Sequence, residues 1–208
     1  MTQRNRTTFA FALALAVGTA VLLSAVGAAG DSTRDKRIIG HMPPLPEERL
    51  AEPIEFKCGF VVHEWRGSPR GEREVAHVEE LCALALERLD PYLARHGLRR
   101  QHDRDFTYDV AFLPDSREYR ALNDINFRFY YRRTTYVITG YTSFTNHFLY
   151  MTGVQNDLEF DVTLLHEQFH AMSDFYGIWT SLDGDQDERV AADEQLAVGF
   201  TRYLGYGE

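Results

Sequence analysis

The chain has 208 residues, of which 44% are hydrophobic and 25% are charged, enough for one sizeable globular domain with a buried core. Its formal net charge is −9. Because binding to the phosphates of nucleic acids needs clustered lysine and arginine, this acidic balance argues against nucleic acid as the main partner.

The first 30 residues differ from the rest of the chain. Residues 1–6 carry Arg4 and Arg6 and no acid, and residues 7–30 carry no charge at all. A basic head, an apolar run and a small-residue end are typical of a secretory signal peptide. The apolar stretch at 8–30 also has the ~20 residues that a membrane-spanning helix needs, so an uncleaved membrane anchor is the alternative. Either way we expect the rest of the chain to be exported: secreted, periplasmic, or anchored to a membrane with the domain outside the cytoplasm.

Residues 31–53 contain four prolines among mixed charges and show no clean periodicity. This composition predicts a linker or a pro-segment, which leaves residues 54–208 as the folded domain.

Strands and helices alternate in the first half of this domain. Residues 54–65 and 106–114 have the composition of strands. Between them, residues 73–97 have the apolar spacing of an amphipathic helix, which Gly97 ends. A short helix is expected at 115–124.

The second half of the domain separates strands from helices. Residues 127–153 are dominated by aromatic and β-branched side chains and are interrupted at Gly140, which predicts two or three strands. Two helices are expected after them, at about 157–174 and 188–204. Because the elements alternate at first and then segregate, the predicted fold class is α+β.

The chain contains two cysteines, Cys58 on a predicted strand and Cys82 on the buried stripe of the first long helix. Two cysteines of an exported chain often pair, so we predict a disulfide, with two buried free thiols as the alternative. The disulfide would close a loop of roughly 25 residues and stabilise the fold by about 3 kcal/mol on the chain-entropy model.

The stretch DVTLLHEQFHAM, residues 161–172, places His166 and His170 four residues apart, with Glu167 directly after the first histidine. On a helix, positions i and i+4 stack on one face, about 6 Å apart at Cβ. Two imidazoles placed in this way can hold one Zn²⁺ at about 2.1 Å, and Glu167 at the edge of the site can take a proton from a metal-bound water. The alternative is a pair of core histidines bonded to backbone or water, but a buried glutamate beside them would need a partner of its own.

The segment TLLHEQFHAM resembles the extended signature of the zincin metallopeptidases, with Thr163 before the first histidine, uncharged residues in the gaps and Met172 after the second histidine. The last helix, with EQLA at 194–197, is similar to the Glu-x-x-Ala helix of the gluzincin branch (peptidase MA-like), although Gln195 stands where glycine is usual. Gly177 is not a ligand, and the further ligand of the metzincin branch is missing.

This resemblance implies a zincin-like fold and hydrolysis of a peptide or protein substrate, with Zn²⁺ bound by His166, His170 and Glu194 and with Glu167 as general base. The family's edge strand, which pairs with an extended substrate, is expected at 146–153, with an ordinary core or hairpin strand as the alternative. A further donor would stabilise the oxyanion. The candidates for this donor are Tyr203, Tyr206 and His147.

The third metal ligand can also be argued from the spacing of the last helix. Glu194 lies in the middle of the apolar stripe that should face the core, where an unpaired carboxylate is costly and a zinc-bound one is not. Glu188, in the first turn, and Asp193 are the alternatives.

Two other functions stay open. Only 38 residues follow His170, which leaves little chain for a specificity pocket, so a zincin-like binding module without turnover is one alternative. Residues 183–194 place acids at positions 1, 3, 5 and 12 of a calcium EF-hand loop, which makes an exported calcium-binding domain the other. Glu188 stands at the position of that loop where glycine is needed for positive φ.

Overall fold

The structure is a computed structural model of the chain and describes residues 47–67, 70–113, 140–144, 147–152 and 157–207. The predicted α+β class is confirmed. The short helix expected at 115–124 and residues 127–139 lie outside the described residues. The elements are η1 (Glu47–Arg49), β1 (Ile54–Glu55), β2 (Phe60–Glu64), α2 (Glu72–Arg95), β3 (Tyr108–Leu113), β4 (Gly140–Ser143), β5 (Phe148–Thr152), α4 (Asp157–Phe175), η2 (Trp179–Ser181) and α5 (Gln186–Tyr203).

The strands form one mixed sheet in the order β1-β2-β3-β5-β4. β2, β3 and β5 are parallel neighbours, whereas β1 and β4 run antiparallel to the strands that they pair with. α2 supplies the crossover that the parallel pair β2–β3 needs. Residues 54–65 form a hairpin and not one strand, because the chain turns at Gly59, whose φ is 94°. A Cβ at this glycine would collide with the carbonyl oxygen of Phe106.

The expectation that residues 146–153 supply an edge strand is wrong. β5 lies inside the sheet, because β3 pairs with one of its edges and β4 folds back onto the other. β4 is instead the last strand of the described sheet, and it packs directly against α4.

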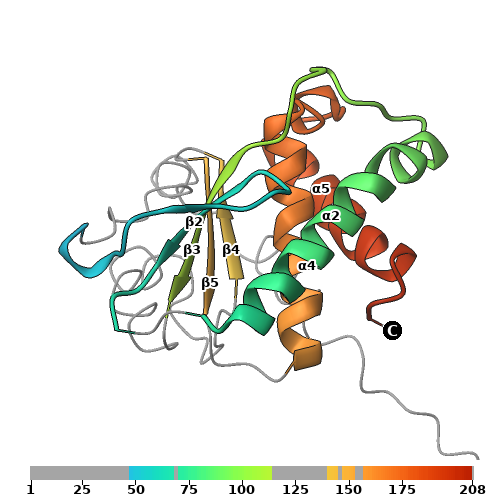
Figure 1. The fold of residues 1–208 in the computed structure, drawn as a ribbon. Helices are drawn as coiled ribbons and strands as arrows, with labels where there is room; N and C mark the ends of the chain where they lie inside the picture. Colours follow the sequence, from blue (N-terminus) through green and yellow to red (C-terminus); the bar gives the residue numbers. More distant parts are fainter. Residues whose placement is uncertain (1–46, 68–69, 114–139, 145–146, 153–156, 208) are drawn as a thin grey trace, which may run out of the picture.

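The three long helices gather on one side of the described sheet, as Figure 1 shows. α4 is central, because it packs against β4 and β5 as well as α2 and α5. Its burial follows from its sequence: Leu164, Leu165, Phe169 and Met172 have no exposed surface, and a helix that is apolar on several faces must be covered on several faces. Phe200 of α5 packs on Phe169, with the ring centroids 5.3 Å apart.

The region before β1 is also packed onto the sheet. Leu50 forms a β-bridge with Trp65, and the backbone N–H of Ala51 donates to the carbonyl of Glu64. Residues 47–53, which the sequence places in a linker or pro-segment, therefore contact β2 in part. The predicted signal or anchor at 1–30 lies outside the described residues, and no helix within them is long and apolar enough to cross a membrane.

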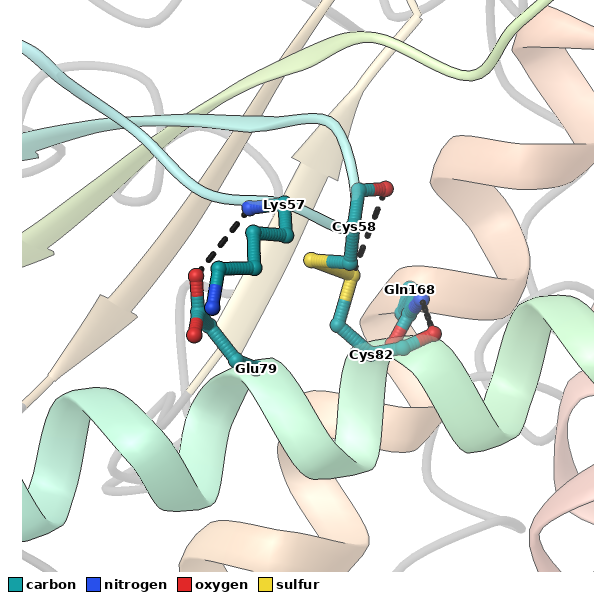
Figure 2. Close-up of a disulfide and its surroundings, with 5 residues drawn as sticks. All are labelled: Lys57, Cys58, Glu79, Cys82 and Gln168. Atoms are coloured by element: carbon teal, nitrogen blue, oxygen red, sulfur yellow. Dashed lines mark hydrogen bonds between the residues drawn. A yellow bond between two sulfur atoms is a disulfide. The ribbon is translucent and has the colours of Figure 1, made fainter.

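Cys58 and Cys82 form the predicted disulfide, which joins the β1–β2 turn to α2 (Figure 2). The sulfur of Cys82 also lies 3.8 Å from the carbonyl oxygen of Cys58, a contact and not a hydrogen bond, because a disulfide sulfur carries no proton. The carbonyl of Cys82 accepts a hydrogen bond of 3.0 Å from Nε2 of Gln168, so the crosslinked helix is tied to α4. A disulfide is consistent with the expected export, because oxidising compartments lie outside the cytoplasm.

Candidate metal centre

Two helices bring three metal-ligand atoms together. His166 and His170 lie on consecutive turns of α4, and their Nε2 atoms are 3.1 Å apart. Glu194 reaches them from α5, with one carboxylate oxygen 3.3 Å from Nε2 of His166 and the other 3.5 Å from Nε2 of His170. The three side chains are thus grouped so that they could hold one metal ion.

The separation of the two histidine nitrogens is compatible with a tetrahedral metal. Ligand bonds of about 2.0–2.1 Å at the tetrahedral angle place the ligand atoms about 3.4 Å apart. The Nε2 atoms of His166 and His170, 3.1 Å apart, lie near that value, and each has a different oxygen of the Glu194 carboxylate within 3.5 Å. The donor set of two imidazole nitrogens and one carboxylate oxygen is one that zinc accepts.

Asp193, the neighbour of Glu194, holds the second histidine in place. One of its carboxylate oxygens accepts from Nδ1–H of His170 at 2.6 Å, and the other accepts from the hydroxyl of Ser173 at 2.5 Å. Asp193 is only 2% exposed, so this hydrogen bond is protected from water. Because Nδ1 carries the proton, the lone pair of a neutral His170 lies on Nε2, the atom that faces Glu194.

The charges of this cluster are strongly coupled. Burial alone would lower the pKa of His170, but the Asp193 and Glu194 carboxylates outweigh burial and raise the pKa well above its ordinary value. Burial would likewise raise the pKa of Glu194, but hydrogen bonds from His166 and His170 outweigh it and hold the pKa far below its ordinary value. Glu194 is therefore ionised at neutral pH, which is the form that metal binding requires.

Glu167 directly follows His166 on α4, and its side chain contacts the sheet at β4. It is 8% exposed, and its Oε2 lies 2.7 Å from the hydroxyl of Thr142 on β4. The same hydroxyl lies 2.9 Å from the carbonyl oxygen of Glu167, so one proton is shared between two acceptors. Gly140 allows this approach, because a Cβ there would lie 2.6 Å from Cγ of Glu167. A carboxylate therefore stands beside the candidate metal ligands and next to the last described strand of the sheet.

Glu188, the other glutamate weighed as a ligand, caps α5. Its carboxylate accepts from the backbone N–H of Asp185 at 2.9 Å, and the Asp185 side chain accepts from the backbone N–H of Glu188 at 3.1 Å. This capping box begins the helix at Gln186. The helix corrects the EF-hand alternative, because most of residues 183–194 are helical and Glu194 faces the histidines and not a calcium loop.

The three oxyanion candidates lie in different surroundings. Tyr203 packs on Tyr92 at 5.5 Å between ring centroids, and Tyr206 packs against the core. His147 is exposed at a positive φ of 53°, and its Nδ1 lies 2.5 Å from a carboxylate oxygen of Asp174. Asp174 lies one helical turn after His170, so His147 is held beside the ligand-bearing part of α4.

Thr142 and Ser173, two supporting side chains of the site, are not predicted from the sequence, which indicates Asp193 only as an alternative ligand. The position of Asp193 next to Glu194 could have indicated its supporting role, since an acid beside a metal ligand can accept a hydrogen bond from a metal-binding histidine. Thr142 has no such signal, because only the packing of β4 on α4 brings it to Glu167.

Comparisons of the chain with protein-family models, with curated proteins and with solved structures gave no match. The function is therefore inferred from the chemistry of the site.

Proposed function

We propose that the protein is an exported zinc-dependent metallopeptidase of the zincin type, gluzincin branch, with residues 54–208 as its peptidase domain. One observation carries the proposal: two imidazoles of α4 and a carboxylate of α5 lie close enough together that they could hold one metal ion, and this donor set is one that zinc accepts. The buried Glu167 beside them completes the set of groups that this reaction needs.

The number of ligands favours a catalytic and not a structural metal. Structural zinc sites have four protein ligands, whereas catalytic sites have three and leave one position open. Within the described residues the group consists of three side chains, His166, His170 and Glu194. The Asp193–His170 hydrogen bond matches the carboxylate–histidine support that metal-binding imidazoles use.

The chain's own residues have distinct roles in the proposed reaction. When bound, zinc would act as a Lewis acid that polarises the peptide carbonyl and lowers the pKa of water. Glu167 takes the proton of the attacking water and delivers it to the leaving amine. Thr142 orients the carboxylate of Glu167 by donating to one of its oxygens. β4, the last strand of the described sheet, is the edge along which an extended peptide would pair.

The proposal is tested with zinc-loaded protein and a mixture of peptides whose cleavage is followed by mass spectrometry. Glu167→Gln should lower the cleavage rate by at least about 100-fold, because it removes the general base. Zinc content and thermal stability should stay at the wild-type level, because Glu167 does not bind the metal.

Glu159→Gln is the matched control, since Glu159 is exposed near the start of the same helix and should be dispensable for cleavage. Cleavage at the wild-type rate by Glu167→Gln would refute the mechanism. A wild-type protein that binds zinc but cleaves no peptide would instead be a zincin-like binding module.

A further inference from the structure

A pair of half-buried aromatic side chains lies near the second histidine, and one of the two borders it. Phe144 directly follows β4, and its ring centroid lies 6.3 Å from that of His170. Trp179, the first residue of η2, meets the same Phe144 edge to face at 5.0 Å. The two rings thus come from segments far apart in the sequence and meet beside the candidate metal centre.

The stability of the core does not account for this pair. The described residues form one hydrophobic core cluster over the sheet, α2, α4 and α5, and neither Phe144 nor Trp179 belongs to it. A single partly exposed aromatic residue needs no explanation. Two that contact each other, one of them against a candidate metal ligand, indicate a surface that another apolar group covers.

The path of β4 places this pair where a bound peptide would present a side chain. Thr142 belongs to β4 and Phe144 to the turn that directly follows it, and the side chains of both approach α4. Thr142 contacts Glu167, and Phe144 lies at His170. A peptide paired along β4 with its reacting bond at Glu167 would thus bring a neighbouring side chain to Phe144 and Trp179.

We propose that Phe144 and Trp179 form a subsite for a large apolar or aromatic side chain, at a substrate residue next to the cleaved bond. This proposal rests on the proposed peptidase function. An aromatic side chain can complete the edge-to-face arrangement that the two rings begin, and a long aliphatic one can cover their exposed faces. A small or charged side chain gains neither contact.

The test uses peptides that are identical except for one residue beside the cleaved bond, which is Phe, Leu, Ala or Glu. They compete in one reaction with zinc-loaded protein, so that product ratios give the ratios of kcat/KM. We expect the Phe or Leu peptide to be cleaved about 10–200-fold faster than the Ala peptide. Phe144→Ala and Trp179→Ala should each lower that ratio by about tenfold, with the zinc content unchanged.

Phe148→Ala is the control for damage to the β4–β5 hairpin, because Phe148 stacks on Tyr150 and not on the pair. Its preference among the peptides should stay at the wild-type level. Cleavage of all four peptides at equal rates would overturn the subsite. So would a preference that survives both alanine variants, or alanine variants that lose zinc and not selectivity.

A binding measurement separates failure of the subsite from failure of the peptidase function. The chain has two tryptophans, so Trp65→Phe leaves Trp179 as the fluorescent reporter. In zinc-loaded Trp65→Phe/Glu167→Gln, the Phe peptide should shift the emission of Trp179 and the Ala peptide should not. If the emission shifts but the wild type cleaves no peptide, the subsite stands and the peptidase function is refuted. If the wild type cleaves peptides but the emission does not shift, only the subsite is refuted.

Discussion

Asp193→Asn should weaken zinc binding and leave the fold intact. Asparagine can keep its oxygen toward Nδ1–H of His170 and turn its NH₂ toward Ser173, whose hydroxyl can accept, so neither partner loses its hydrogen bond. What is lost is the charge of an acceptor that is 2% exposed and 2.6 Å from the imidazole. A charged acceptor makes a hydrogen bond roughly twice as strong as a neutral one. Removing such a partner behind a metal-binding histidine costs about 10–100-fold in metal affinity, or about 1.4–2.7 kcal/mol.

The assay is a competitive zinc titration against a chromophoric chelator, with circular dichroism to verify folding. Asp161→Asn is a close control, because Asp161 is also on α4, is 9% exposed, and pairs with His77 at 2.7 Å. It removes the charge of a buried aspartate that pairs with a half-exposed histidine away from the candidate metal site, and it should leave zinc affinity unchanged. Equal zinc affinity of Asp193→Asn and the wild type would refute the inferred support of His170.

Three further outcomes follow from the packing around the site. Thr142→Val should lower kcat by about tenfold at unchanged KM and zinc content, because the general base loses its orienting donor; steady-state kinetics on one peptide tests this. Gly199→Ala should destabilise the wild type, because the new Cβ would lie 2.5 Å from the hydroxyl oxygen of Tyr92. In a Tyr92→Phe background, which lacks that oxygen, the same substitution should stabilise the fold by up to about 1 kcal/mol, because alanine has a higher helix propensity than glycine. Urea denaturation of the four proteins in that cycle shows whether the sign reverses. Replacing Cys58 and Cys82 by serine should lower the free energy of unfolding by about 3 kcal/mol, measured in the same way, and an unchanged value would contradict a structural role for the disulfide.

The two last helices, and the grouping of three side chains that could hold a metal, could be predicted because their signals are local. Residues 157–174 and 188–204 were expected to be helical, and α4 and α5 span Asp157–Phe175 and Gln186–Tyr203. The position of Glu194 in the apolar stripe separated it from Glu188, whose role in capping is a property of the first helical turn.

What could not be predicted depends on contacts between distant segments. A strand pattern at 146–153 shows which side chains are apolar but not which strands lie on either side, so β5 was mistaken for an edge. Thr142 reaches Glu167 through the packing of β4 on α4, and Trp179 meets Phe144 where η2 packs on α4. No spacing of residues in the sequence indicates these contacts between distant segments.

The central claim is that His166, His170 and Glu194 hold one zinc ion, and zinc titration of two glutamate variants tests it most directly. The wild type should bind about one zinc per chain. Glu194→Ala should lose affinity by more than the roughly 100-fold limit expected for Asp193→Asn, because it removes a ligand and not the support of a ligand. Glu188→Ala should bind zinc as the wild type does, at the cost of about 1 kcal/mol of helix-cap stability. Tight zinc binding by Glu194→Ala together with its loss in Glu188→Ala would contradict the account.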